Sequence, residues 1–184
     1  DGLDFGSAYE MLYTVLAEVC VTHGYLQESA CVAPYDKNLL KRIEAGTATQ
    51  VELKNSFVTL TRAMAAHYGK RVILLLDEYD VPIAKASAKG YYAEMLDVVK
   101  GLMQALKDND ALRFAVVTGC LRIAKESIFT GTNNFVSDTI SSSHLNEYFG
   151  FTQTDVDRLL KDADCQEHAD DIKNWYDGYH FGDL

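Results

Sequence analysis

The sequence predicts an α/β protein, with a parallel sheet packed against helices and a small helical subdomain at the carboxyl end. Two apolar runs, Arg71–Leu76 and Leu112–Val117, have the length and composition of strands buried on both faces. A helical pattern over Tyr91–Lys107 lies between them, and such a strand, helix and strand form a right-handed crossover between parallel neighbours. We therefore expect an α/β core at residues 1–150 and the start of a helical subdomain at residues 151–184.

The elements before the first buried strand are mostly helical. Leu3–Phe5 fits the tail of a strand, and Ser7 with Glu10 three residues later has the spacing of a capping box that opens a helix to His23. A short helix capped by Asp36 is expected to reach Ala45. A longer helix is expected to begin at Thr47 or Thr49 and to end near Gly69.

The elements after the first buried strand continue the α/β pattern. Pro82 indicates a turn, and the second buried strand follows the loop at residues 108–110. A further short strand fits Phe135–Ile140. Helices are expected from Thr152 to about Ala163 and over Ala169–Tyr176.

Composition and charge exclude several classes of protein. The 184 residues carry a formal net charge of -10 with a pI near 4.8, which argues against a broad nucleic-acid footprint because phosphate binding depends on Lys and Arg. No apolar run approaches the length of a transmembrane helix, so we expect a soluble, cytoplasmic protein. The cysteines lie far apart without zinc-ligand spacing, and reduced thiols are expected at four positions: Cys20, Cys31, Cys120 and Cys165.

An acidic cluster follows directly on the first buried strand. Asp77 and Glu78 are expected at the carboxyl end of that strand, where open α/β sheets bind their ligands. The pattern resembles the Walker B element of nucleotide hydrolases, in which a first acid serves Mg²⁺ and a second orients the attacking water. The alternative is that the strand simply ends in a polar turn that Pro82 enforces.

Polar groups also follow the second buried strand. Thr118 is expected to lie beside the acidic cluster and to reach a terminal phosphate or the attacking water, the role called sensor 1. The alternative is a threonine that satisfies loop backbone groups. Arg122 and Lys125 follow within a turn or two, and either can neutralise charge on a transferred phosphoryl group, or both can belong to a solvated helix face.

One expected motif is absent from the 184 residues. The chain contains no G-x-x-x-x-G-K-[ST] loop, whose amides and lysine hold nucleotide phosphates, and Gly119–Lys125 is no substitute because it lacks the GK[ST] ending. The chain also begins at Asp1 without a methionine and shows no signal-peptide pattern. We expect it to be a piece of a longer protein.

Four motifs in order resemble the bacterial AAA-ATPase-like family. They are DEYDVP at 77–82, the strand and TG ending at 113–119, SIFTGTNN at 127–134 and WYDGYHFG at 175–182. The resemblance implies a three-layer P-loop NTPase-like parallel sheet, here incomplete because its first strand is missing, with a small helical lid. It also implies a downstream nuclease-like domain of the PD-(D/E)XK type in the full protein.

The resemblance further implies roles for particular residues. Asp77 would serve Mg²⁺ and bind the cofactor, Glu78 would be the catalytic acid of Walker B, and Thr118 would occupy the sensor position, with Arg122 as a catalytic candidate. The cofactors implied are ATP and Mg²⁺ in the intact protein, with neither expected to bind this chain tightly.

Three functions remain open from the sequence. The first is an ATP-hydrolysing switch module that controls a downstream effector. The second is a degenerate scaffold that keeps the fold and works as a protein-interaction module. The third is a regulatory part of a protein that acts on DNA through a separate nuclease domain. An incomplete sheet would also leave open strand edges, which predict self-association.

Overall fold

The computed structural model describes residues 2–120 and 135–176, which belong to two compact units. The first unit extends to Thr132 and the second begins at Asn133. The described part is mostly helical, with one small parallel sheet in the first unit, so the predicted α/β class is confirmed. The division into an α/β core at residues 1–150 and the start of a helical lid at residues 151–184 stays a prediction.

The first unit contains seven described α-helices, one short 3₁₀ helix and two strands. In chain order they are α1 (Phe5–Thr22), α2 (Tyr25–Glu28), α3 (Pro34–Glu44), α4 (Gln50–Lys54), α5 (Ser56–Tyr68), β1 (Val72–Leu76), α6 (Val81–Lys89), α7 (Tyr92–Met103), η1 (Gln104–Leu106) and β2 (Leu112–Val117).

The two strands pair in parallel, as the sequence predicts. Ile73 lies opposite Phe114 and Leu76 opposite Val117, with one irregularity in the register just after Val72. The helices α6 and α7 connect the two strands. Parallel strands need such a crossover, because the end of the first strand and the start of the second lie at opposite ends of the sheet. The carboxyl ends of β1 and β2 therefore meet at one edge.

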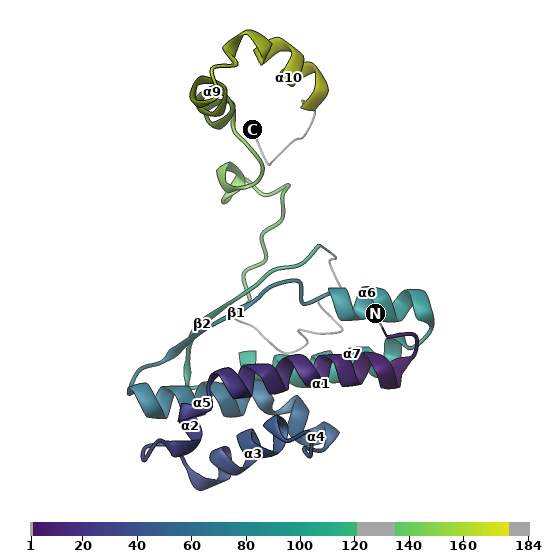
Figure 1. Cartoon of the computed structure of the whole chain (residues 1–184), viewed down its shortest axis with the longest axis vertical. Helices are drawn as coiled ribbons and strands as arrows, with labels where there is room; N and C mark the ends of the chain where they lie inside the picture. The colour runs from purple at the N-terminus through teal and green to yellow at the C-terminus, as the bar shows by residue number, and fades with distance from the viewer. Residues whose placement is uncertain (1, 121–134, 177–184) are drawn as a thin grey trace. The chain divides into compact units, whose positions relative to one another are not determined.

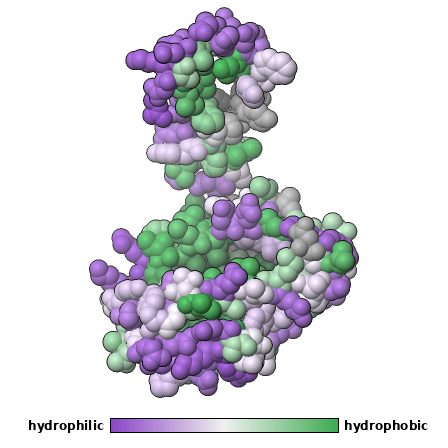
Figure 2. All heavy atoms as spheres, in the orientation of Figure 1, coloured by the Kyte–Doolittle hydropathy of each residue, from purple (hydrophilic) through white to green (hydrophobic). Residues whose placement is uncertain are grey.

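The expectation that both strands are buried on both faces is wrong for the described residues. Alternate side chains are half-buried on the face toward the helices, whereas the other face is exposed and apolar. The exposed fractions on that face, which we call the open sheet face, are 47% for Ile73, 70% for Leu75, 48% for Phe114 and 45% for Val116. Figure 1 shows the helical layer on one side of the strands, and Figure 2 shows hydrophobic side chains gathered over them.

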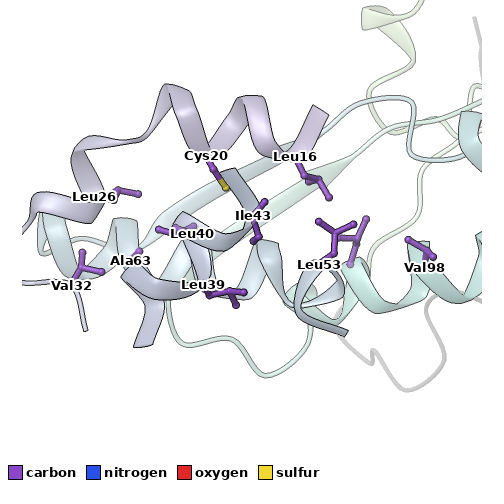
Figure 3. Close-up of a cluster of buried hydrophobic side chains, with 11 residues drawn as sticks. Leu16, Cys20, Leu26, Val32, Leu39, Leu40, Ile43, Leu53, Ala63 and Val98 are labelled. Atoms are coloured by element: carbon purple, nitrogen blue, oxygen red, sulfur yellow. The ribbon is translucent and has the colours of Figure 1, made fainter. Parts of the chain in front are cut away.

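The helices of the first unit pack around two clusters of buried side chains. The larger cluster joins α1, α3, α4, α5 and α7 through residues such as Leu16, Leu40 and Leu53 (Figure 3). The smaller cluster joins α6 to α7 through Ile83 and Met95, and the partly buried end of β1 packs against it. This second cluster therefore supports the carboxyl end of β1, where Leu76 packs against it.

The amino end differs from the sequence-based expectation. Leu3 and Asp4 form a bend rather than a strand, and α1 begins at Phe5. The Asp4 carboxylate accepts a hydrogen bond from the Ser7 amide at 2.9 Å, so Asp4 is the cap and Ser7 is the third helical residue. Ser7 was expected as the cap, but an aspartate three residues earlier fills that role equally well.

The predicted α3 cap is also wrong, whereas the next helix start is confirmed. α3 begins at Pro34, which fits a first helical position, and Asp36 is 2% exposed and pairs with Arg62 of α5 instead of capping. Of the two expected starts, Thr47 and Thr49, the structure selects Thr49, which forms a capping box with Glu52 at α4. The helical stretch after Thr49 is divided between α4 and α5 at Asn55.

Pro82 lies inside a helix rather than in a turn. α6 begins at Val81, and a proline in the first helical turn removes no intrahelical hydrogen bond because the first amides have no partner within the helix. The chain therefore turns at residues 77–80, immediately after β1, and enters a helix that was not expected from the sequence.

The second unit contains two described α-helices, α9 (Gln153–Asp162) and α10 (Ala169–Tyr176), with the 3₁₀ helices η2 (Asn146–Tyr148) and η3 (Gln166–His168). Both α-helices agree with the predicted ranges, and Thr152 caps α9.

Phe135–Ile140 is irregular rather than a strand. Thr139 and Ser142 hydrogen bond locally, with Thr139 N donating to Ser142 Oγ at 3.0 Å, and such bonds compete with strand pairing. Across the two described ranges, no helix combines the length and the apolar character that a membrane span requires.

Candidate functional site

The predicted acidic residues lie at the carboxyl end of β1. Asp77 and Glu78 directly follow Leu76, and both side chains are exposed. Thr118 directly follows β2 and is exposed as well. Because β1 and β2 are parallel neighbours, three of the four predicted site residues meet at one edge of the sheet.

A hydrogen bond joins the two strand ends. The Thr118 hydroxyl donates to Oδ1 of Asp77, and the same oxygen accepts from the Glu78 amide at 3.0 Å. The backbone of Thr118 is bound on both sides, since its amide donates to Leu76 O at 2.8 Å and its carbonyl accepts from Tyr79 N at 3.2 Å. The position of Thr118 is therefore set by the turn that carries the two acids.

Glu78 has a left-handed backbone, with φ of 52°. A non-glycine residue in this region is uncommon and costs on the order of 1 kcal/mol. The turn is closed by a hydrogen bond from Val81 N to Glu78 O at 3.1 Å, so the strained residue is held at the start of α6. This conformation leaves the Glu78 carboxylate exposed beside Asp77.

The sequence analysis missed the importance of Asp80. Its side chain is 2% exposed, unlike the exposed acids three and two positions before it, and its carbonyl accepts from the Ile83 and Ala84 amides at 3.0 and 2.8 Å. The DEYD pattern includes this residue, but composition alone does not distinguish a buried carboxylate from a solvated one. In the structure, Asp80 lies directly before α6 and its carboxylate faces the loop after β2 at Gly119.

Several predicted functional segments lie outside the described residues. Arg122, Lys125 and the segment 127–134 fall in the range 121–134, and 177–182 falls in the carboxyl-terminal range.

A hollow of about 570 Å³ on the described surface of the second unit is lined by Cys165, His168 and Trp175 among others. It contains none of the predicted site residues. Within residues 2–120 and 135–176, the candidate site consists of exposed side chains at the carboxyl ends of β1 and β2.

Comparison with known proteins identifies the family. A family model described as "Predicted AAA-ATPase" matches residues 5–129, which include β1, the acidic turn and β2. The chain belongs to this predicted AAA-ATPase family. Its match therefore covers the strand ends that carry Asp77, Glu78 and Thr118.

One curated relative of this AAA-ATPase family member has no assigned activity. It is the "Uncharacterized protein in vnfD 5'region" of Azotobacter chroococcum mcd 1, 36% identical over 135 residues. The alignment covers 72% of this chain and 26% of the relative, so the chain spans about a quarter of the length of the relative it matches. No solved structure matches the chain significantly.

Proposed function

We propose that this chain is part of an ATP-hydrolysing switch module in a cytosolic bacterial protein, where ATP state controls a downstream effector. Asp77 serves a nucleotide-bound Mg²⁺, Glu78 orients the attacking water and Thr118 senses the terminal phosphate. Arg122 neutralises charge on the transferred group. The downstream effector in this proposal is a nuclease-like domain of the intact protein.

The observation that carries the proposal is the meeting of Asp77, Glu78 and Thr118 at the ends of neighbouring parallel strands. Ligands of open α/β sheets bind outside the carboxyl ends of the strands. The hydrogen bond from Thr118 to Asp77 ties a hydroxyl to the carboxylate that is proposed to face the metal. The family match over residues 5–129 supports the same class of chemistry.

The residues present fit a metal that arrives with nucleotide. Mg²⁺ usually takes one or two carboxylates and fills its remaining positions with phosphate and water oxygens. Asp77 is one exposed carboxylate, and the part of the chain that the structure describes holds no group of three acidic, His or Cys side chains that would bind a metal alone. Bound Mg²⁺ would supply charge neutralisation to the phosphates.

The first test is Glu78→Gln in the intact protein. The amide keeps the size of the side chain but cannot accept a proton from water, so turnover should fall by at least about a hundredfold while ATP binding stays within about twofold. Steady-state hydrolysis and calorimetric ATP binding measure the two effects. Glu94→Gln, at an exposed position on α7, is the matched control, and unchanged turnover in Glu78→Gln would contradict the assignment.

The second test concerns the 184-residue chain alone. The chain contains no G-x-x-x-x-G-K-[ST] loop, and the amides and lysine of that loop supply most of the phosphate contacts. We expect calorimetry with Mg-ATP to detect weak binding or none. Tight, Mg²⁺-dependent binding would mean that these residues hold the nucleotide without a phosphate loop.

A degenerate scaffold that works as a protein-interaction module is the second candidate. The open sheet face favours it, because contiguous exposed apolar side chains mark sites of association. A protein of this kind would bind its partner without ATP, and neither Asp77→Asn nor Glu78→Gln would change that binding. The absence of turnover in the intact protein, together with unchanged partner binding in both variants, would favour this candidate.

A further inference from the structure

The loops that follow β1 and β2 touch at Gly119. A Cβ atom placed on Gly119 would lie 2.5 Å from Oδ1 of Asp80 and 2.8 Å from Cε1 of Tyr79, and real Cβ atoms essentially never approach another atom within 3.0 Å. The φ of Gly119 lies outside the left-handed region. A glycine is therefore required here for space and not for backbone conformation.

The Asp80 side of this contact is anchored. Asp80 is 2% exposed, and its carbonyl accepts the hydrogen bonds that begin α6. The Tyr79 ring packs against the cluster of buried side chains between α6 and α7, which includes Ile83. Neither neighbour of Gly119 can move away without disturbing buried packing, so any added atom would displace the loop after β2 instead.

Displacement of that loop would move Thr118. Thr118 directly precedes Gly119, and its hydroxyl donates to Asp77 while its carbonyl accepts from Tyr79 N. Relief of a contact from 2.5 to 3.0 Å requires a shift of at least about 0.5 Å, which is the tolerance within which catalytic groups must be held.

We propose that Asp80 and Gly119 are positioning residues that fit the two loops together and so set the placement of the Thr118 hydroxyl against the Asp77 carboxylate. The inference rests on the proposed function for its catalytic consequence, but the placement itself is a property of this chain without nucleotide.

The first experiment therefore measures placement without ATP. In the wild-type chain, Asp77→Asn should shift the Thr118 methyl resonance, because the hydroxyl on the same side chain loses its carboxylate acceptor. In the Gly119→Ala background the same substitution should produce less than half of that shift. The resonance is assigned by its disappearance in Thr118→Ser. An undiminished shift in Gly119→Ala would overturn the proposal, whatever the protein hydrolyses.

Gly6→Ala is the matched control for the same one-carbon addition. Its Cβ would lie 3.3 Å from a side-chain oxygen of Asp4, a contact that needs only a small adjustment at the start of α1. We call the shift of the Thr118 methyl resonance caused by Asp77→Asn the Thr118 coupling. In the Gly6→Ala background we expect this coupling to keep its wild-type size. Loss of the coupling in Gly6→Ala would show that the effect is not specific to residue 119.

The second experiment measures turnover in the intact protein. Gly119→Ala should lower kcat by about tenfold while the Kd for ATP stays within about twofold, because misplacement by a fraction of an ångström affects the transition state more than binding. A fall in kcat, ATP affinity and melting temperature together would indicate a merely structural role and would overturn the proposal. No turnover in wild type would instead contradict the proposed function and leave the methyl measurement decisive.

Variants of Asp80 test the same contact if Gly119→Ala does not fold. The Asp80 side chain makes no capping hydrogen bond to α6, so Asp80→Ser leaves the backbone bonds that begin the helix in place. The shorter serine side chain withdraws the atoms that face Gly119, so the Thr118 coupling should weaken. Asp80→Asn preserves the shape and should retain more of the coupling and of kcat than Asp80→Ser. Equal loss in both variants would show that Asp80 acts through its charge rather than its shape.

Discussion

Glu78 combines two properties at the scale of one residue. It is the proposed water-orienting acid, and its backbone lies in the left-handed region with φ of 52°. Strained backbone at a functional residue persists only when the surrounding structure holds it, here the hydrogen bonds that close the turn between β1 and α6. The strain is thus a stability cost at the point where the proposed chemistry takes place.

Glu78→Gly should separate stability from activity. Glycine adopts positive φ without strain, so the free energy of unfolding of the chain should rise by up to about 1 kcal/mol, while hydrolysis by the intact protein is lost with the carboxylate. Chemical denaturation and steady-state turnover measure the two effects.

Asp108→Gly is the matched control for this prediction. Asp108 has φ of 47° in the exposed loop before β2, so the same relief of strain is expected there with no change in turnover. A loss of about 1 kcal/mol in Glu78→Gly, the usual effect of glycine in ordinary backbone, would contradict the left-handed conformation.

At the scale of elements, three helix starts each contain a carboxylate whose pKa is lowered by a capping hydrogen bond. The pKa of Asp4 is lowered by the Ser7 amide that it accepts from, that of Glu52 by the Thr49 amide, and that of Asp155 by the Thr152 hydroxyl. Each carboxylate belongs to the capping box of its helix, respectively α1, α4 and α9. Folding therefore stabilises the ionised form of each of these carboxylates.

The cap of α9 should weaken in acid. Because the folded pKa of Asp155 lies below its ordinary value of 3.8, its contribution to stability is present above that value and is lost as the pH falls through the lower folded pKa. Thr152→Ala removes the cap and should cost α9 about 1 kcal/mol at neutral pH. Amide exchange in α9, followed against pH, measures both, and a Thr152→Ala variant with the wild-type acid response would contradict the assignment.

At the scale of the whole molecule, the open sheet face is an exposed apolar surface in the described residues. Ile73 and Leu75 of β1 lie in register with Phe114 and Val116 of β2, so four exposed apolar side chains form one patch. Among residues 2–120 and 135–176 the sheet has only two strands, each with one unpaired edge. Parallel sheets are ordinarily covered on both faces, and uncovered edges are templates for pairing.

We propose that a second copy of this chain covers the patch when the 184-residue chain is concentrated. Each copy carries a net charge of -10, so the copies repel one another at low salt, and screening should strengthen association. Light scattering should therefore give a mass that rises with concentration, and more so in about 0.5 M salt.

Leu75→Asp tests whether the patch carries this association. The substitution should keep the chain monomeric, whereas Val51→Asp, an equally exposed position on α4, should not. A monomer at high concentration and high salt would contradict self-association, and equal effects of both substitutions would show that charge and not the patch is responsible.

The sequence by itself determined the α/β class, both strands and the helix start at Thr152, because hydrophobic runs and local side-chain-to-backbone bonds depend on neighbouring residues. It narrowed the start of α4 to Thr47 or Thr49, and its ordered motifs indicated the family. It also placed Asp77, Glu78 and Thr118 at strand ends. The sequence did not indicate which acid would be buried, since Asp77 and Asp80 are the same residue type three positions apart.

Only the tertiary structure decided that Asp80 is enclosed where α6 begins, that Gly119 is required by close approach, and that one face of the sheet is open in the described residues. The sequence does not predict the alternation of exposure along β1, because every residue from Val72 to Leu76 is aliphatic and could be buried. The contact between Asp80 and Gly119 joins segments about 40 residues apart in the sequence. It depends on the path of α6 and α7, which return the chain to β2 beside β1.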